Sequence, residues 1–342
     1  MLTLLYNYPL SRRNSFGLDV KAAKFVEYSC VEDLQTFVRQ NGADQLADTE
    51  QPLWLHIGGG NNLLFTGDYK GVILHSALRG VEELYRAEGK VLLRAGAAEL
   101  WDNFVAWSIA HDAYGLENLS LIPSEVGAAA VQNIGAYGAE AKDFIHSVEA
   151  VDLLTGEIVN FTNSDCGFAY RHSNFKAAWA GRYAITHVTF ALSTAFVPNF
   201  SYRALASAFP VASAATAQQL RDAVIAIRRS KLPEPAELGN AGSFFMNPVI
   251  SQEHFAQLQK AYPNVPSFAA TEGVKVPAAW LIEQAGWKGR SLGRAGVYER
   301  QPLVLVNRGG AMGADIVNLA DAIIADVAAK FAITLRPEVI MV

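Results

Sequence analysis

The sequence predicts an α+β protein with mixed sheets and two or three domains. The chain has 342 residues, of which 51% are hydrophobic and 18% charged, so it can bury a large core and divide into domains of about 150 residues. Apolar runs of strand length alternate irregularly with stretches of helical periodicity. This irregular order favours an α+β arrangement over a single doubly wound parallel sheet.

The N-terminal part predicts one helix between strands. Ser29 followed by Glu32 forms a capping-box pattern, and Gly42 predicts where the helix ends. Apolar runs over 52–57 and 71–75 predict two strands, with a glycine-rich loop between them.

The middle of the chain predicts a strand over 90–95 and a helix over 100–109 that ends at Gly115. A Thr-Gly pair divides the segment 147–162 into two strand-like halves, which predicts a hairpin. Further predicted elements are strands over 182–193, 302–307 and 334–342, and helices over 216–230, 251–261, 277–285 and 315–331. The segment 233–242 (PEPAELGNAG) predicts a linker or the entry to a new domain.

Charge and composition exclude several classes of protein. The chain carries 28 Lys and Arg against 33 Asp and Glu, a net charge of −5, so we expect no nucleic-acid partner. No apolar stretch is long enough to span a membrane and the N-terminus lacks the order of a secretory signal, so we expect a cytoplasmic protein. The two cysteines and seven histidines show no ligand spacing, so we expect no metal site.

The segment GGGNN, Gly58 to Asn62, follows a predicted strand. Glycines there let the backbone approach a ligand and direct successive N–H groups at a phosphate. The dinucleotide fingerprint is incomplete, because Leu63 stands where its third glycine belongs. A glycine-rich turn without a ligand is the alternative.

A second loop, 123–138 (PSEVGAAAVQNIGAYG), is rich in small residues without helical or strand periodicity. Such a segment suggests backbone packed against a flat, extended ligand, with Gln132 and Asn133 supplying amide contacts, although a purely structural loop is the alternative. Two such loops in one chain favour a dinucleotide with a pyrophosphate and an aromatic ring system.

Side chains suited to an anionic substrate stand at further places. These are Tyr170 and Arg171, the cations Arg228, Arg229 and Lys231, the pair Ser243 and Asn247, and Glu338. Each has a simpler interpretation: cations are favoured at a helix C-terminus, a serine after glycine is common at a cap or turn, and a glutamate in a terminal strand commonly faces solvent.

Taken in order, eight segments resemble the MurB family of UDP-N-acetylenolpyruvoylglucosamine reductases, which make peptidoglycan precursors. They are NSFGLDVKA (14–22), GGGNNLLF (58–65), IPSEVGAAAVQNIGAYG (122–138), FAYRHSNFK (168–176), RRSKLP (228–233), GNAGSFFMNP (239–248), AAWLIEQAGWKG (278–289) and RPEV (336–339). The segment NFSYRALASAF (199–209) is similar to the tyrosine-bearing loop of the type I subfamily.

The resemblance implies an FAD-binding fold of the vanillyl-alcohol-oxidase type, made of two subdomains, and a third α+β substrate-binding domain. We expect subdomains over 1–82 and 83–230, a substrate domain over 231–332, and a last strand, 333–342, that returns to the active site. It also implies non-covalent FAD, NADPH as co-substrate, a UDP-sugar enolpyruvyl ether as substrate, and a monomer.

The resemblance assigns catalysis to Arg171, which stabilises charge on the substrate carboxylate, to Ser243, which donates a proton, and to Glu338, which donates a hydrogen bond when protonated. The implied FAD contacts are Gly58, Gly59, Gly60, Asn61, Asn62, Leu63, Ser124, Val126, Gly127, Gln132, Asn133, Gly135, Ala136 and Tyr137. The implied substrate contacts are Tyr170, Tyr202, Arg228, Lys231, Asn247 and Gln301.

Four positions depart from the family pattern. Asn61 stands where a serine is common, Ser124 and Ala130 replace a usual glycine and proline, and Ile340 stands where type I members often have a basic residue. Two competing hypotheses are a flavin oxidase or dehydrogenase of the same fold with another substrate, and an inactive UDP-sugar-binding protein. The first would not share RRSKLP, GNAGSFF and RPEV together, and the intact catalytic trio argues against the second.

Overall fold

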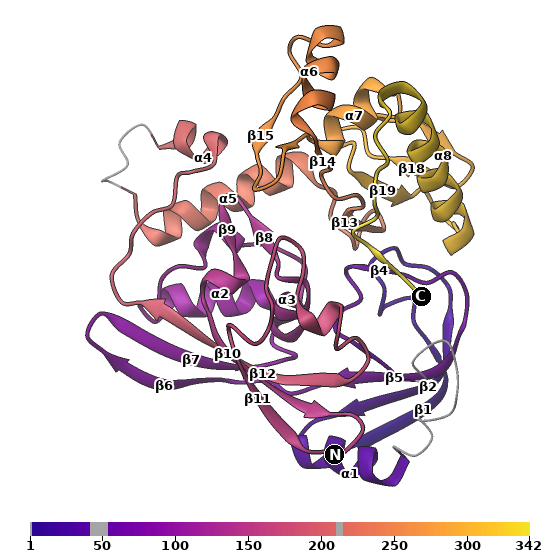
Figure 1. The fold of residues 1–342 in the computed structure, drawn as a ribbon. Coiled ribbons are helices and arrows are strands. Elements are labelled where there is room, and N and C mark those ends of the chain that lie inside the picture. Colours follow the sequence, from indigo (N-terminus) through magenta and orange to yellow (C-terminus); the bar gives the residue numbers. More distant parts are fainter. Residues whose placement is uncertain (1, 42–53, 210–214) are drawn as a thin grey trace. The chain divides into compact units, whose positions relative to one another are not determined.

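The computed structural model describes residues 2–41, 54–209 and 215–342, which fold into two compact units (Figure 1). The first unit comprises Met1–Tyr8, Ala22–Gly59 and Lys70–Ser230, and the second comprises Pro9–Lys21, Gly60–Tyr69 and Lys231–Val342. Neither unit is a single stretch of chain, because the N-terminal part contributes to both. The expected division into three domains stays a prediction.

The first unit contains two large sheets. The four-stranded sheet has the order β1-β2-β5-β3, formed by β1 (Leu2–Pro9), β2 (Lys21–Tyr28), β5 (Tyr69–Ser76) and β3 (Trp54–Ile57). The five-stranded sheet has the order β11-β10-β12-β7-β6, formed by β11 (Ile158–Thr162), β10 (Ile145–Asp152), β12 (Tyr183–Ser193), β7 (Lys90–Gly96) and β6 (Val81–Ala87). Strands β3 and β5 pair in parallel, whereas all pairs of the five-stranded sheet are antiparallel.

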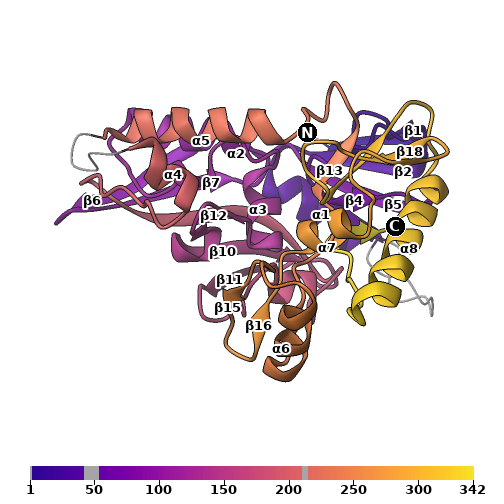
Figure 2. The same ribbon diagram turned by 90° about the horizontal axis from the view of Figure 1, so that it is seen from above.

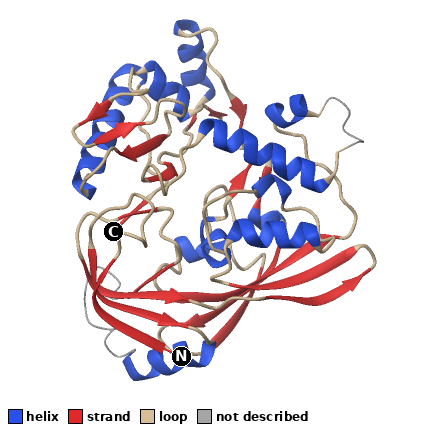
Figure 3. Ribbon diagram, turned by 180° about the vertical axis from the view of Figure 1, so that it is seen from behind, coloured by secondary structure: helices blue, strands red, loops and turns tan. Residues whose placement is uncertain are grey.

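Helices cover both faces of the sheets in the first unit. The helices α2 (Trp101–Ala110), α3 (Val126–Gln132) and α5 (Ala217–Lys231) lie on one side, and α1 (Val31–Asn41) lies on the other, as Figure 3 shows from behind. Aromatic rings of Trp101, Phe104 and Phe190 pack between α2 and β12, with centroids 4.9 to 6.1 Å apart. Burial of such large apolar side chains is the main source of stability here.

Short elements complete the first unit. They are β8 (Gly135–Ala136), β9 (Ala139–Glu140), α4 (Arg203–Ala208) and the 3-10 turns Glu117–Leu119, Ala141–Asp143 and Asn174–Lys176.

The second unit is built of short strands and three helices (Figure 2). Its main sheet has the order β13-β19-β18-β17, formed by β13 (Asn240–Ser243), β19 (Val304–Asn307), β18 (Ala295–Val297) and β17 (Ser291–Leu292). The helices are α6 (Gln252–Ala261), α7 (Ala278–Gln284) and α8 (Gly313–Phe331), and the smaller strands are β14 (Val249–Ile250), β16 (Val274–Lys275), β15 (Phe268–Ala269), β4 (Leu63–Leu64) and β20 (Ile340–Met341). Strand β20 pairs in parallel with β4.

Most of the elements predicted from periodicity are confirmed. The predicted helices of the C-terminal half correspond to α5, α6, α7 and α8, and the 147–162 hairpin forms from β10 and β11. Within the described residues, no helix is long and apolar enough to cross a membrane, and no cluster of three or more His, Cys, Asp or Glu could hold a metal ion.

Three expectations are wrong. Helix α2 ends at Ala110, and Gly115 instead allows close approach, since a Cβ built there would lie 2.7 Å from the ring of Phe144. Only Ile340–Met341 of the expected terminal strand is a strand, and Pro337 before it forms an isolated antiparallel bridge with Phe245. The small-residue loop contains a helix, α3. The predicted helix end at Gly42 lies outside the described residues.

Glu149 on β10 forms a polar cluster within the five-stranded sheet. Its carboxylate lies 2.9 Å from His187 Nδ1 and accepts hydrogen bonds from Thr186 Oγ1 (2.7 Å) and Arg94 Nη2 (3.0 Å). The contact with His187, followed by those with Thr186 and Arg94, lowers the pKa of Glu149 to about 2, although burial acts against this.

We predict that Glu149→Gln lowers the free energy of unfolding at pH 7 by about 1–3 kcal/mol, because it weakens hydrogen bonds to a charged group. A carboxylate with a depressed pKa stabilises the fold fully above its ordinary pKa of 4.5, and this stability is lost as the pH falls toward about 2. Denaturant unfolding across this window would show the loss in the parent and a flatter profile in Glu149→Gln. Glu83→Gln, which removes an exposed pair with Arg86, is the control and should change little.

Candidate functional site

Asn133 ends helix α3 and sets the course of the segment 123–138, which we call the second glycine-rich segment. It is fully buried and has φ +44°, in the left-handed region. The N–H groups of Asn133 and Ile134 donate to the carbonyls of Ala130 and Ala129. This C-cap turns the chain sharply out of the helix into β8.

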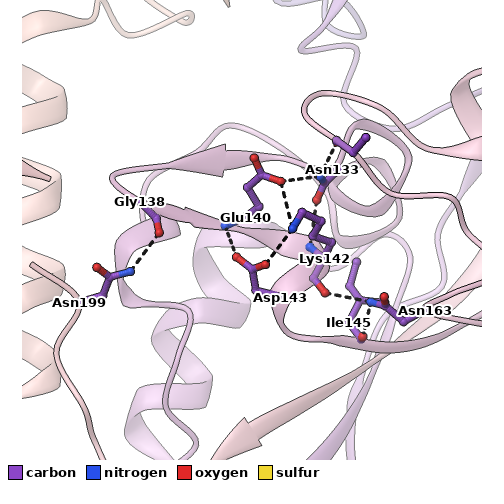
Figure 4. A network of polar contacts seen from close by, with 9 residues as sticks. Asn133, Gly138, Glu140, Lys142, Asp143, Ile145, Asn163 and Asn199 are labelled. Atoms are coloured by element: carbon purple, nitrogen blue, oxygen red, sulfur yellow. Dashed lines mark hydrogen bonds and ion pairs between the residues drawn. The ribbon is translucent and has the colours of Figure 1, made fainter. Parts of the chain in front are cut away.

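The side chain of Asn133 is held by its neighbours, as Figure 4 shows. Its Nδ2 donates to Glu140 Oε2 (2.9 Å) and to the carbonyl of Ala169 (2.8 Å), and its Oδ1 accepts from the N–H of Lys142 (2.9 Å). The amide assigned to a ligand from the sequence therefore makes three contacts within the protein, and these contacts join loops that are remote in sequence.

Arg171 is anchored on the same segment. Its Nη2 donates to the carbonyl of Gly135 (2.6 Å) and its Nη1 to that of Asn133 (3.4 Å), while its guanidinium lies 5.5 Å from the ring centre of Tyr170. A Cβ built on Gly135 would lie 3.0 Å from Arg171 Nη1. A side chain at position 135 would therefore displace the arginine.

The segment 58–62, which we call the first glycine-rich segment, requires glycine at two positions for steric reasons. A Cβ on Gly58 would lie 3.0 Å from Glu125 Oε2 and 3.2 Å from the Cβ of Ala128. Gly60 has φ +67°, and a Cβ there would clash with the carbonyl of Arg13. Both positions thus bring backbone into direct contact with other backbone or with a carboxylate.

The start of α3 is already engaged with the protein. The N–H groups of Val126 and Gly127 donate to the carbonyls of Glu99 and Ala97, each at 2.9 Å. A Cβ on Gly127 would lie 2.9 Å from that of Ala97, so this glycine serves close packing. The hydroxyl of Ser124 donates to the neighbouring carbonyl at position 125.

The end of α3 contributes a further contact within the protein. Gln132 Oε1 accepts from Lys176 Nζ (2.8 Å), so its side-chain oxygen binds a neighbouring cation. The remaining predicted positions on this segment, Ala136 and Tyr137, follow in β8 and the turn after it.

In the second unit, Ser243 and Glu338 lie on adjacent backbone segments. Ser243 is exposed at the end of β13, and the N–H of Glu338 donates to the carbonyl of the next residue, Phe244 (2.8 Å). Asn62 of the first glycine-rich segment donates from Nδ2 to the carbonyl of Glu338 (3.2 Å). The structure therefore brings together three predicted site residues from the start, the middle and the end of this unit.

Tyr137, Tyr202 and Arg228 form a cluster in the first unit. The two tyrosine rings meet edge to face with centroids 5.0 Å apart. Burial raises the pKa of Tyr137, and the charge and hydrogen bond of Arg228 partly oppose this. Arg228 also donates from Nε to the carbonyl of Leu121 (3.1 Å), and Lys231 is the last residue of the same helix, α5.

Two predicted substrate contacts bind local backbone. Asn247 Oδ1 accepts from the N–H of Ala278 at the start of α7 (2.9 Å), and Gln301 Oε1 accepts from the N–H of Leu303 (3.4 Å). Their amide oxygens are therefore used in shaping the second unit.

The sequence does not indicate two close contacts between acidic and basic side chains near the second segment. Arg221 on α5 pairs with Asp102 on α2 at 2.6 Å, and His75 on β5 lies 3.5 Å from Glu125. The sequence feature that could have indicated these contacts is a charged residue within a segment of otherwise apolar or small residues.

Comparisons with known proteins show the family to which the chain belongs. Residues 22–162 match the family model "FAD binding domain", and residues 234–342 match the model "UDP-N-acetylenolpyruvoylglucosamine reductase, C-terminal domain". The chain is 47% identical to the UDP-N-acetylenolpyruvoylglucosamine reductase of Porphyromonas gingivalis, over 97% of both chains. It is 46% identical to that of Bacteroides fragilis, over 97% of this chain and 98% of the relative, and 46% identical to that of Neisseria gonorrhoeae, over 99% and 97%.

A solved structure shares the fold along the whole chain. The crystal structure of UDP-N-acetylenolpyruvylglucosamine reductase (MurB) from Thermus caldophilus aligns with a TM-score of 0.66 and 20% identity, covering 100% of this chain and 98% of that one. The expected α+β fold, with an FAD-binding domain and a further C-terminal domain, is confirmed.

We predict that Asn133→Ala lowers the free energy of unfolding by about 3 kcal/mol, because it removes buried hydrogen bonds and places alanine in the left-handed region. Asn133→Gly should be less destabilising by about 1 kcal/mol, since glycine adopts this φ without strain. Asn163→Ala is the control, because the half-buried Asn163 also donates two side-chain bonds to backbone, to the carbonyls of Lys142 and Ile145, but does not cap α3. Thermal unfolding that ranked alanine above glycine at position 133 would contradict the role of the turn.

Proposed function

Because the chain belongs to the UDP-N-acetylenolpyruvoylglucosamine reductase family, we propose that it reduces a UDP-sugar enolpyruvyl ether to the corresponding UDP-N-acetylmuramate, with FAD as cofactor and NADPH as electron source. The observation that carries this proposal is the 46–47% identity to reductases over nearly the whole chain. The hydrogen bond from the N–H of Glu338 to the carbonyl of Phe244, the residue after Ser243, supports it from the structure. We also propose that the protein is a monomer and acts in the cytoplasm.

The residues present fit FAD. Gly58, Gly60, Gly127 and Gly135 pack against the protein itself, so they fix the course of the two glycine-rich segments. Both segments lie within the residues that match the FAD binding domain model. We assign the contacts, through backbone or through packing, to Gly58, Gly59, Gly60, Asn61, Asn62, Leu63, Ser124, Val126, Gly127, Gln132, Asn133, Gly135, Ala136 and Tyr137. FAD, when bound and reduced, supplies the hydride.

Arg171 binds the substrate carboxylate in this proposal. Hydride addition to the vinyl carbon leaves negative charge on the neighbouring carbon, and this charge spreads into the carboxylate. A planar guanidinium stabilises such charge by charge-assisted hydrogen bonds, and its contacts with Asn133 and Gly135 fix its orientation in advance. A group that is preorganised toward developing charge lowers the barrier without reorganising during the reaction.

Ser243 and Glu338 complete the reaction. The Ser243 hydroxyl donates a proton to the carbon that carries the charge, and the adjacent Glu338, in its protonated form, donates a hydrogen bond to the carboxylate. A carbanion next to a carboxylate is basic enough to take a proton from a hydroxyl, and water or a neighbour then restores the serine.

The remaining contacts hold the UDP-sugar. Arg228 and Lys231, one turn apart at the end of α5, bind the diphosphate, and the partly exposed Tyr202 covers the substrate beside Tyr137. We assign further contacts to Tyr170, Asn247 and Gln301.

We predict that Ser243→Ala separates the two half-reactions. Anaerobic stopped-flow mixing with NADPH should bleach the flavin of parent and variant at similar rates, whereas reoxidation by the enolpyruvyl UDP-sugar should slow by about 10²- to 10⁴-fold in the variant. Ser251→Ala, which removes the N-cap of α6 in the same unit, is the control for a general loss of a serine. A parent protein that binds no flavin would refute the proposed function, and an unimpaired second half-reaction in Ser243→Ala would refute the role of the serine.

We predict that Arg171→Lys lowers kcat by about 10- to 100-fold, because an ammonium keeps the charge but not the planar fork. FAD affinity should remain near that of the parent. Steady-state kinetics that show an unchanged kcat would exclude a bidentate carboxylate contact at this position.

A further inference from the structure

The first unit contains a row of titratable side chains that the proposed reaction does not use. It consists of Glu27 on β2, His75 on β5 and Glu125 directly before α3, and we call it the Glu–His–Glu array. His75 Nδ1 lies 3.0 Å from Glu27 Oε2, and its Nε2 lies 3.5 Å from Glu125 Oε1. His75 and Glu125 are only 4% and 7% exposed.

The two imidazole nitrogens of His75 each face a carboxylate, so the ring joins two elements of the unit. A buried carboxylate is costly unless a polar partner faces it, and His75 Nε2 faces Glu125 at 3.5 Å. The ring of His75 also stacks on Phe25, with centroids 5.8 Å apart, which fixes its plane. His75 and Glu125 are thus both buried and held in place.

Glu125 belongs to the second glycine-rich segment and its side chain faces the first. It is the N-cap residue of α3 in the second segment, and its Oε2 lies where a Cβ on Gly58 of the first segment would be only 3.0 Å away. One carboxylate therefore sets the spacing between these parts of the two segments, and His75 ties that carboxylate to the four-stranded sheet.

A neutral pair lies beside the array and also holds the first segment. His56, two residues before Gly58, lies with Nε2 2.8 Å from the hydroxyl of Tyr28. Burial, helped by the nearby His75, lowers the pKa of His56, and burial raises that of Tyr28. This pair is therefore neutral near pH 7.

We propose that the Glu–His–Glu array is a positioning device for FAD, in which Glu125 and His75 hold the two glycine-rich segments at the separation that the cofactor requires. This inference rests on the proposed function in one respect, namely that these segments bind FAD. It assigns Glu125 and His75 no contact with the substrate.

The test is FAD binding to the apoprotein of Glu125→Gln and His75→Gln, measured by quenching of flavin fluorescence, together with the visible circular dichroism of the bound flavin. The Kd for FAD should rise about tenfold or more, which corresponds to about 1.4 kcal/mol, and the dichroism should change. The matched control is Glu149→Gln, because Glu149 also pairs with a histidine, His187 at 2.9 Å, but between two strands of the five-stranded sheet. It should lower the melting temperature of the apoprotein without changing the Kd or the dichroism.

A milder variant covers the case in which the buried substitutions prevent folding. Glu27, at the outer end of the array, has a side chain that is 35% exposed, so Glu27→Gln should fold and raise the Kd in the same direction but by less. If the variants that fold bind FAD with the parental Kd and dichroism and differ only in melting temperature, the inference is wrong. A parent protein that binds no FAD would instead refute the proposed function.

Discussion

The candidate site depends on one buried amide. Asn133 stands in the left-handed region at the end of α3, and its side chain bonds to Glu140, Lys142 and Ala169. These bonds hold the turn whose carbonyls, at positions 133 and 135, accept from Arg171. The position of the arginine therefore follows from the course of the backbone, and that course follows from a side chain that itself contacts no anion in the proposed reaction.

A second constraint acts in the other unit. Asn62, Ser243 and Glu338 come from stretches that are far apart in sequence. The Asn62 side chain donates to the carbonyl of Glu338, and the N–H of Glu338 donates to the carbonyl of Phe244, the residue after Ser243. Arg171 belongs to the first unit and this trio to the second. Glycines that permit close backbone contacts recur near these groups, at Gly135 and Gly60.

The sequence predicted the parts of the fold that depend on local patterns. Amphipathic periodicity located α5 and α8, and the Thr-Gly pair located the β10–β11 hairpin. It did not predict α3, because its alanines and glycine are buried on nearly every side and leave no amphipathic stripe. The direction of the Asn133 side chain also escaped prediction, since its partner Ala169 is 36 positions away.

The glycine-rich segments and the motif residues of the site were recognisable from the sequence, but the interactions that hold them were not. The partner of Glu125 is His75 on strand β5, and nothing in the sequence around either residue indicates that the two side chains meet. Long-range pairs of this kind arise from tertiary packing, which cannot be predicted from local periodicity. The buried charges of the first unit are therefore findings of the structure.

A crystal structure of the protein with FAD and the enolpyruvyl UDP-sugar would test the central claim, that Arg171, Ser243 and Glu338 contact one substrate. The account predicts the Arg171 guanidinium at hydrogen-bond distance from the substrate carboxylate. It also predicts Ser243 Oγ about 3–3.5 Å from the carbon to be protonated, with Glu338 on the same carboxylate. A substrate bound without Arg171, or with Ser243 and Glu338 remote from its enolpyruvyl group, would contradict it.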